Sequence, residues 1–185
     1  MNESNEPNGS EPSLAHGSAP TSGARTAATI RAAEPRDTAA IAAFILDLAR
    51  YERREHECTI DLERLREHLF GPRPVCEALL AEIDARPIGF ALFYTSYSTF
   101  RTAPCVHLED LYVDPDRRGH GTGLALLRAV ARIAVARGCP RLDWSVLDWN
   151  EPAIGFYRRH GATVLPDWRV CRLDGPALSA MGAAQ

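Results

Sequence analysis

Large apolar side chains are rare in the first 27 residues of this 185-residue chain, and then recur at regular spacing almost to its end. Residues 1–27 consist mainly of Ser, Gly, Pro, Asn, Ala and Glu. Such a segment cannot bury enough apolar surface to offset the entropy lost on ordering. We therefore expect a disordered tail over 1–27, one ordered domain over 28–178 and a frayed C-terminus over 179–185.

The apolar pattern predicts an alternation of strands and helices. Short apolar runs between turn residues predict strands over residues 29–32, 77–83, 88–96, 108–113, 141–146 and 168–173. Apolar residues at helical spacing predict helices over about 35–52, 124–137 and 152–160, and a further helix that ends at about residue 70 and is capped by Thr59 or Asp61. A turn over 84–87 makes a hairpin, and a polar, aromatic loop follows over 97–104. This order of elements indicates an α/β fold with a mixed sheet.

The strand over 108–113 is irregular. It reads L-E-D-L-Y-V, and its inward and outward positions do not alternate cleanly around Glu109 and Asp110. A β-bulge at this point explains the break in the pattern. The bulge would also splay this central strand away from the strand over 141–146, and so leave a gap between the two.

A glycine-rich loop with two arginines follows the central strand. Arg117 and Arg118 supply fixed positive charge, and Gly119, Gly121 and Gly123 allow the backbone to approach a ligand closely. The helix that begins here directs its first unpaired N–H groups, at the positive end of its dipole, toward the same space. Strand, loop and helix start together predict a binding site for an anion.

Two familiar phosphate-binding motifs do not fit this loop. A P-loop requires Lys and Ser or Thr after its last glycine, where this chain has Leu124. The Rossmann fingerprint requires G-x-G-x-x-G, but the spacing here is G-x-G-x-G. Asp143 lies 20 residues beyond Gly123, where a ribose-binding acid would be sought, but the long turn with two arginines argues against that fold. The remaining pattern is R-x-x-G-x-G, formed by Arg118, Gly121 and Gly123.

This pattern, preceded by L-E-D-L-Y-V, resembles the acetyl-CoA pyrophosphate loop of the GNAT superfamily of N-acetyltransferases. Three more stretches resemble its spermidine/spermine (diamine) and thialysine acetyltransferase branch: L-A-R-Y-E over 48–52, the aromatic stretch over 94–100, and W-N-E-P-A-I-G-F-Y-R-R-H-G-A over 149–162. The similarity runs from about residue 29 to 173. It implies the GNAT fold, in which α-helices flank a mixed sheet with a splayed, bulged central strand. It also implies acetyl-CoA as co-substrate and a homodimer.

The resemblance gives roles to individual residues. Tyr157 matches the general acid that protonates the departing CoA thiolate, and Glu109 matches the residue that deprotonates the amine through water. The N–H groups of Leu111 and Val113 would bind the pantetheine arm in the gap and polarise the thioester. From the residues alone, Tyr157 is more often a core tyrosine, and Glu109 a strand-end charge paired with an arginine.

The remaining site residues that the resemblance implies form two sets. The cofactor set consists of Leu111, Tyr112, Val113, Arg118, Gly119, His120, Gly121, Thr122, Gly123, Leu124, Asn150, Glu151, Pro152 and Ala153. The substrate set consists of Tyr51, Glu52, Glu109, Asp143, Trp144 and Ser145. The acidic members of the substrate set would attract a flexible dication. From the residues alone, each of these acids could be ordinary surface charge.

Composition narrows the function classes. All 21 basic residues are Arg, and the net charge of −3 argues against a general nucleic-acid binder. We find no signal-peptide pattern and no apolar stretch long enough for a membrane span. The five cysteines form no C-x-x-C pair, which favours reduced thiols in a cytoplasmic protein. The six histidines lack metal-binding spacing, so we expect no metal.

The resemblance, supported by the acidic substrate set, implies an acetyl-CoA-dependent N-acetyltransferase that acts on the primary amine of a small cationic metabolite, such as a polyamine, diamine, thialysine or lysine-like compound. Direct transfer is favoured over an acyl-enzyme, because Cys105 and Cys139 have no adjacent base in the sequence. Two alternatives stay open: a non-catalytic acetyl-CoA-binding module, and an enzyme that acetylates a peptide or protein amine. The presence of both Tyr157 and Glu109 favours the enzyme.

Overall fold

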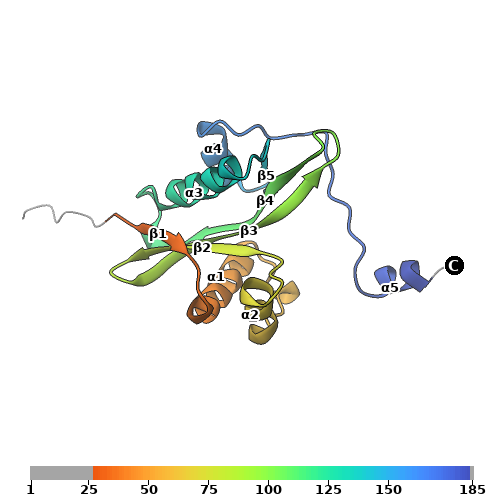
Figure 1. The fold of residues 1–185 in the computed structure, drawn as a ribbon, viewed down its shortest axis with the longest axis horizontal. Helices are drawn as coiled ribbons and strands as arrows, with labels where there is room; N and C mark the ends of the chain where they lie inside the picture. The colour runs from red at the N-terminus through yellow and green to blue at the C-terminus, as the bar shows by residue number, and fades with distance from the viewer. Residues whose placement is uncertain (1–26, 184–185) are drawn as a thin grey trace, which may run out of the picture.

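The computed structural model describes residues 27–183, so almost all of the tail expected over 1–27 lies outside the described residues. The strands are β1 Thr29–Ala32, β2 Glu77–Ile83, β3 Arg86–Ser98, β4 Ala103–Val113 and β5 Leu142–Trp144. They form one sheet in the order β1–β2–β3–β4–β5 (Figure 1). Neighbouring strands are antiparallel except β4 and β5, which are parallel. The expected α/β fold with a mixed sheet is confirmed.

Helices cover both faces of the sheet. They are α1 Thr38–Tyr51, α2 Leu62–Phe70, α3 Thr122–Ala136, α4 Glu151–Arg159 and α5 Gly175–Ala183, with single 3-10 turns at η1 Pro35–Asp37, η2 Glu55–Glu57 and η3 Pro115–Arg117. Figure 1 shows α1 and α2 on one face, and α3 and α4 on the other. Within residues 27–183, no helix is long and apolar enough to cross a membrane.

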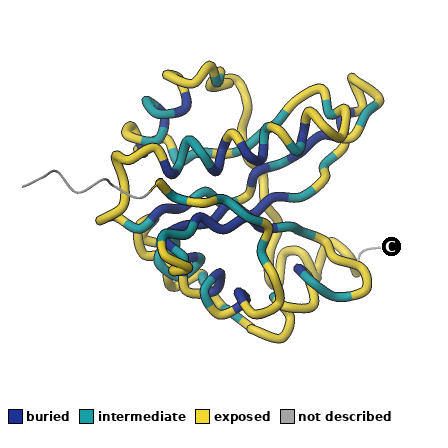
Figure 2. Tube along the Cα trace, turned by 60° about the vertical axis from the view of Figure 1, so that its left-hand side comes forward, coloured by how far each residue is buried: buried dark blue, intermediate teal, exposed yellow. Residues whose placement is uncertain are grey.

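Each face of the sheet has its own core, visible as dark blue stretches in Figure 2. Toward α1, the rings of Phe44 and Phe90 stack with 5.7 Å between their centroids. Toward α3, Leu126 and Val130 pack in one buried cluster with Leu108 of the central strand. The sheet is therefore clamped between two apolar layers, which gives the residues of β4 a rigid frame.

The central strand β4 carries the expected bulge. Leu92 of β3 pairs with Asp110, but the next residue, Phe93, pairs with Leu108, so Glu109 is the extra residue. β5 pairs with β4 only as far as Leu108, and the two strands then separate. The bulge and the gap predicted from the broken alternation are both confirmed.

Two predicted boundaries in the sheet were wrong. The loop expected over 97–104 is a turn over 99–102, because β3 continues to Ser98 and β4 already begins at Ala103. The aromatic and β-branched residues here favour strands, and they outweigh the local turn signals. β5 is also shorter than expected, because it leaves its partner at the gap.

The C-terminal segment departs furthest from expectation. The strand expected over 168–173 is wrong: these residues are exposed and pair with none of the five strands in the described sheet. They lead to α5, which was not expected, lies partly in the region 179–185 and stands apart from the domain in Figure 1. Alternating apolar residues form a strand only where a sheet edge lies beside them, and here the segment leaves the sheet.

Candidate active site

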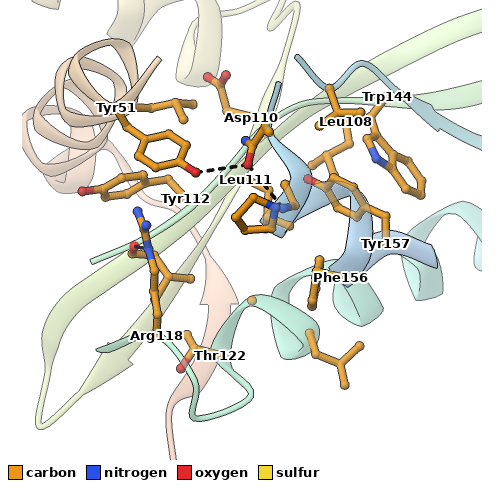
Figure 3. A pocket seen from close by; sticks show the side chains of 18 of the residues that line it. Tyr51, Leu108, Asp110, Leu111, Tyr112, Arg118, Thr122, Trp144, Phe156 and Tyr157 are labelled. Atoms are coloured by element: carbon orange, nitrogen blue, oxygen red, sulfur yellow. Dashed lines mark hydrogen bonds between the residues drawn. The ribbon is translucent and has the colours of Figure 1, made fainter. Parts of the chain in front are cut away.

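A cavity of about 520 Å³ opens where β4 and β5 separate. Its walls come from the end of α1, the second half of β4, the loop that leads into α3, and the chain from Trp144 into α4 (Figure 3). Segments from distant parts of the sequence thus meet at the bulge. The irregularity at Glu109 makes the space that the site requires.

The backbone N–H groups of Leu111 and Val113 point into the gap. In an antiparallel ladder, alternate residues bond to the partner strand. The N–H of Asp114 donates to the carbonyl of Ile88 in β3 at 2.9 Å. Val113 and Leu111 lie one and three residues before Asp114, an odd number in each case, so their N–H groups point away from β3. β5 has already left β4 at this point, so these two N–H groups can bind a ligand in the gap.

The loop between β4 and α3 has the geometry of an anion site. Gly119 and Gly121 have φ values of 78° and 84°, in the left-handed region that side chains rarely adopt. Gly121 is also the N-cap of α3, so the first N–H groups of this helix face the cavity that Thr122 and Gly123 line. The space around the Cβ positions of Gly119 and Gly121 is open, which leaves room for a phosphate group.

Arg118 follows η3 in the loop between β4 and α3 and lies against two aromatic rings. Its Nε donates to the carbonyl oxygen of Val113 at 2.8 Å. Its guanidinium carbon lies 5.1 Å from the ring centroid of Tyr51 and 5.4 Å from that of Tyr112 (Figure 3). These contacts hold a permanent positive charge in the cavity wall, beside the N–H groups of the gap.

Tyr157 reaches the cavity from α4. Asn150 caps this helix by accepting a hydrogen bond from the N–H of Ala153 at 3.3 Å, as expected. The ring of Tyr157 is buried, with its centroid 5.0 Å from that of Trp144 (Figure 3). Burial, and secondly the charge of Glu52, raises the pKa of Tyr157 to about 12. The phenol therefore keeps its proton at every physiological pH.

Three carboxyl groups line the same cavity. Burial raises the pKa of Glu52, and Arg54 partly offsets that effect. Burial, with the charges of Glu109 and Glu52, raises the pKa of Asp110 to about 7. Glu109 is exposed and lies 3.8 Å from the imidazole of His107. Crowded carboxyl groups of this kind favour a bound cation, which relieves their repulsion.

Most residues expected at the site do line the cavity. Both expected catalytic residues, Tyr157 and Glu109, do so. The substrate set contributes Tyr51, Glu52, Trp144 and Ser145. The cofactor set contributes Leu111, Tyr112, Val113, Arg118, Gly119, Gly121, Thr122, Gly123, Leu124, Asn150, Pro152 and Ala153.

Three expected residues lie outside this cavity wall: His120, Glu151 and Asp143. Asp143 pairs instead with Arg141, with 2.6 Å between the charged atoms. Successive side chains of a strand point to opposite faces, so Trp144, which lines the cavity, turns its neighbour Asp143 away from it.

Among the carboxyl groups that line the cavity, Asp110 is the one that sequence reasoning missed. We placed only Glu109 from this strand in the amine site, yet both residues line the cavity. The signal was present, because a bulge lets two consecutive residues face the same side of a sheet. The broken alternation that predicted the bulge therefore also pointed to Asp110.

Comparison with known proteins matches this chain to acetyltransferases. Residues 40–162 match the model of the Acetyltransferase (GNAT) family. The chain is 37% identical over 160 residues to the thialysine N-epsilon-acetyltransferase of Bos taurus, which covers 80% of this chain and 94% of that protein. It is 43% identical over 98 residues to an L-ornithine N5-acetyltransferase of Arabidopsis thaliana, which covers 53% of this chain and 43% of that protein.

A solved structure shares the fold. It is an integron cassette protein from the mobile metagenome of V. cholerae, with a TM-score of 0.72 and 23% identity over 86% of this chain and 99% of that one. The geometry of the site also fits acetyl-CoA. The glycine loop suits its pyrophosphate, and the N–H groups in the gap suit its narrow pantetheine arm. Because the family match spans more than half of the sequence, the chain belongs to the GNAT family of acetyltransferases and takes its acetyl group from acetyl-CoA.

Proposed function

We propose that this enzyme transfers acetyl from acetyl-CoA directly to the primary amine of a small cationic metabolite of the thialysine, ornithine or diamine type. The observation that carries the proposal is the group of carboxyls from Glu52, Glu109 and Asp110 in the cavity that also holds Tyr157. A positively charged substrate would offset the burial of Glu52 and Asp110 and the repulsion of Asp110 by the charges of Glu109 and Glu52. Relatives named for the acetylation of thialysine and ornithine support the same class of substrate.

In the proposed reaction, the donor half of the site holds the acetyl donor and supplies a proton. The N–H groups of Leu111 and Val113 bond to the arm in the gap, and the start of α3 neutralises the pyrophosphate. Acetyl-CoA, when bound, supplies a thioester carbonyl. Tyr157, which its raised pKa keeps protonated, gives its proton to the sulfur as the C–S bond breaks.

The acceptor half prepares the amine. An amine with a pKa of about 10 is mostly ammonium at pH 7 and must lose a proton before its nitrogen can attack. In this proposal Glu109 accepts that proton through a water, while Asp110 and Glu52 hold a second positive charge of the substrate. The acetyl group moves from sulfur to nitrogen, and the nitrogen then loses a second proton, which replaces the one that Tyr157 gave to the sulfur. The proton taken up by Glu109 passes to solvent.

A screen of amines with acetyl-CoA, read as the release of free CoA, tests this proposal. We expect thialysine, ornithine and short diamines to be acetylated, and mass spectrometry to place the acetyl group on a primary amine. Peptides with a free amine serve as the comparison. Faster turnover of peptides than of every small amine would refute the metabolite and favour a peptide substrate.

We further propose that the enzyme is a two-fold homodimer. The C-terminal segment exposes Trp168 and Val170 to 74% and 80%, and the turn between β3 and β4 exposes Phe100 to 91%. Exposed apolar side chains on an extended segment are stabilised when a second copy covers them. The family resemblance points to the same assembly.

Light scattering at micromolar concentration tests the assembly. The parent protein should have the mass of a dimer, and Trp168→Glu should shift it toward the monomer. Val135→Glu is the matched control, because Val135 is also an exposed apolar residue, 77% accessible, but lies on α3. A monomeric parent protein would reject the dimer.

A further inference from the structure

Tyr51 takes part in a contact that joins the two faces of the sheet. It is the last residue of α1, on one face, and its hydroxyl donates to Oδ1 of Asn150 at 3.1 Å. Asn150 is the N-cap of α4, on the other face, and lies 99 residues further along the chain. Both residues line the cavity, so this hydrogen bond ties its two sides together.

The oxygen that Tyr51 binds already has a structural role. Oδ1 of Asn150 accepts the N–H of Ala153 at 3.3 Å and thereby caps α4. Asn150 is buried, so few alternative partners compete for its side chain. A second hydrogen bond to the same oxygen restricts the rotamer of Asn150 and so fixes the start of α4. Tyr157 lies on this helix, two turns further on.

The ring of Tyr51 is held from two sides, which fixes the direction of its hydroxyl. The guanidinium of Arg118 lies 5.1 Å from its centroid, and the ring of Trp149 lies 6.0 Å away. Arg53 lies 5.9 Å over the ring of Trp149 in turn. These contacts span from the loop after η3 to the segment just before α4. Figure 3 shows Tyr51 and Arg118 on the side of the cavity opposite to Tyr157.

We propose that Tyr51 is a positioning residue for catalysis, which acts through Asn150 on α4 and thereby on Tyr157. The family resemblance had placed Tyr51 in the wall of the amine site, where it would affect amine binding. The inference rests on the proposed function, because it takes Tyr157 as the proton donor. The two roles predict different kinetic effects, since a positioning residue changes the chemical step and a wall residue changes amine binding.

Tyr51→Phe removes the hydroxyl and keeps the ring in place. We expect kcat to fall about 3–10-fold, the effect of one net hydrogen bond, while KM for the amine stays within about twofold. An increase in the amine KM at unchanged kcat would overturn the positioning role and restore Tyr51 to the amine wall. Tyr97→Phe is the matched control, because Tyr97 is 60% exposed and should leave both constants unchanged.

Hydrogen exchange of the Ala153 N–H tests the same contact without any turnover. Exchange should be about 3–10-fold faster in Tyr51→Phe than in the parent or in Tyr97→Phe, because the cap oxygen of Asn150 becomes less restricted. Equal exchange in all three proteins would overturn the proposal. Faster exchange in an enzyme that acetylated no small amine would uphold the contact and separately refute the proposed substrate class.

A double-mutant cycle tests whether Tyr51 acts through Asn150. Asn150→Ala removes the shared oxygen, so adding Tyr51→Phe to this variant should lower kcat no further. Losses that multiply in the double variant would show that Tyr51 acts by a route independent of Asn150, and would overturn the proposal.

Discussion

Tyr157 and Asp110 both have raised pKa values in one cavity, and burial is the main cause for both. A phenol is neutral when protonated, so its shift keeps on Tyr157 the proton that, in the proposed reaction, goes to the departing sulfur. A carboxyl becomes charged when deprotonated, so its shift moves the change of charge close to neutral pH. The same physical cause thus suits one group to donate a proton and the other to respond to a cation.

Replacement of Tyr157 by Phe tests the donor role. The ring packing against Trp144 should survive, so acetyl-CoA affinity by calorimetry should stay within about twofold, while kcat should fall roughly 10²–10⁴-fold. With a pKa of about 12, Tyr157 stays protonated up to about pH 11, so an alkaline loss of activity below that pH must have another cause. Turnover of Tyr157→Phe at the parent rate would make this tyrosine structural.

Replacement of Asp110 by Asn tests the cost of its burial. The folded-state pKa of about 7 lies above the ordinary value of 3.8, so the buried carboxyl destabilises the fold increasingly as pH rises toward and through 7. Asp110→Asn should therefore raise the Tm at pH 8 by about 3 °C or more, roughly the effect of 1 kcal/mol in a chain of this size. At pH 4 the change should be much smaller. Equal changes at both pH values would contradict the raised pKa.

At this scale, sequence reasoning identified the groups whose chemistry is fixed by type and spacing. Tyr157, Glu109 and the glycines of the loop all line the cavity. It failed where the direction of a side chain depends on strand phase. Asp143 was expected in the cavity wall and is not there, whereas Asp110 was not expected and is there. The bulge shifts by one residue which side chains of β4 face the cavity, and β5 has no such shift.

At the scale of elements, the site depends on the pairing of β3 with β4. Gly89 of β3 pairs with Val113, and a Cβ at Gly89 would lie only 2.6 Å from the carbonyl oxygen of Tyr112. The two strands approach so closely that the backbone, which cannot rotate aside, would have to shift. Glycine is therefore required here by packing rather than by its φ angle.

Gly89→Ala should destabilise the protein by about 1–3 kcal/mol, the usual effect of overpacking, measured by urea unfolding. Gly182→Ala is the control, because nothing lies within 4 Å of its Cβ position, and its effect should be within about 0.5 kcal/mol. Equal stability of Gly89→Ala and the parent protein would mean that β3 and β4 can separate without cost.

Helices and long strands were predictable because their apolar residues recur with the period of the element, on the face that packs against the core. The bulge was predictable because it breaks that periodicity. The ends of β3 and β4 were not, because aromatic residues and turn residues compete there and long-range pairing decides between them. The prediction of a strand over 168–173 was wrong for a related reason, because an apolar pattern does not show whether a sheet edge is available for pairing.

At the scale of the whole molecule, the fold brings an anion site and a group of acids to the two ends of one gap. The glycine loop and α3 approach the gap from one face of the sheet, and α1 with Glu52 approaches from the other. A donor with a pyrophosphate and an acceptor with a positive charge can therefore meet at the separated strands. The two layers of helices keep these halves fixed relative to each other.

The central claim is that this arrangement selects a small amine by its second positive charge. The most direct measurement is kcat/KM for a straight-chain diamine and for the monoamine of the same length, in the parent enzyme and in Asp110→Asn. We predict that the parent prefers the diamine by about tenfold or more, the effect of a hydrogen bond to a charged group, and that Asp110→Asn loses most of this preference. Equal kcat/KM for the two amines in the parent enzyme would contradict the account.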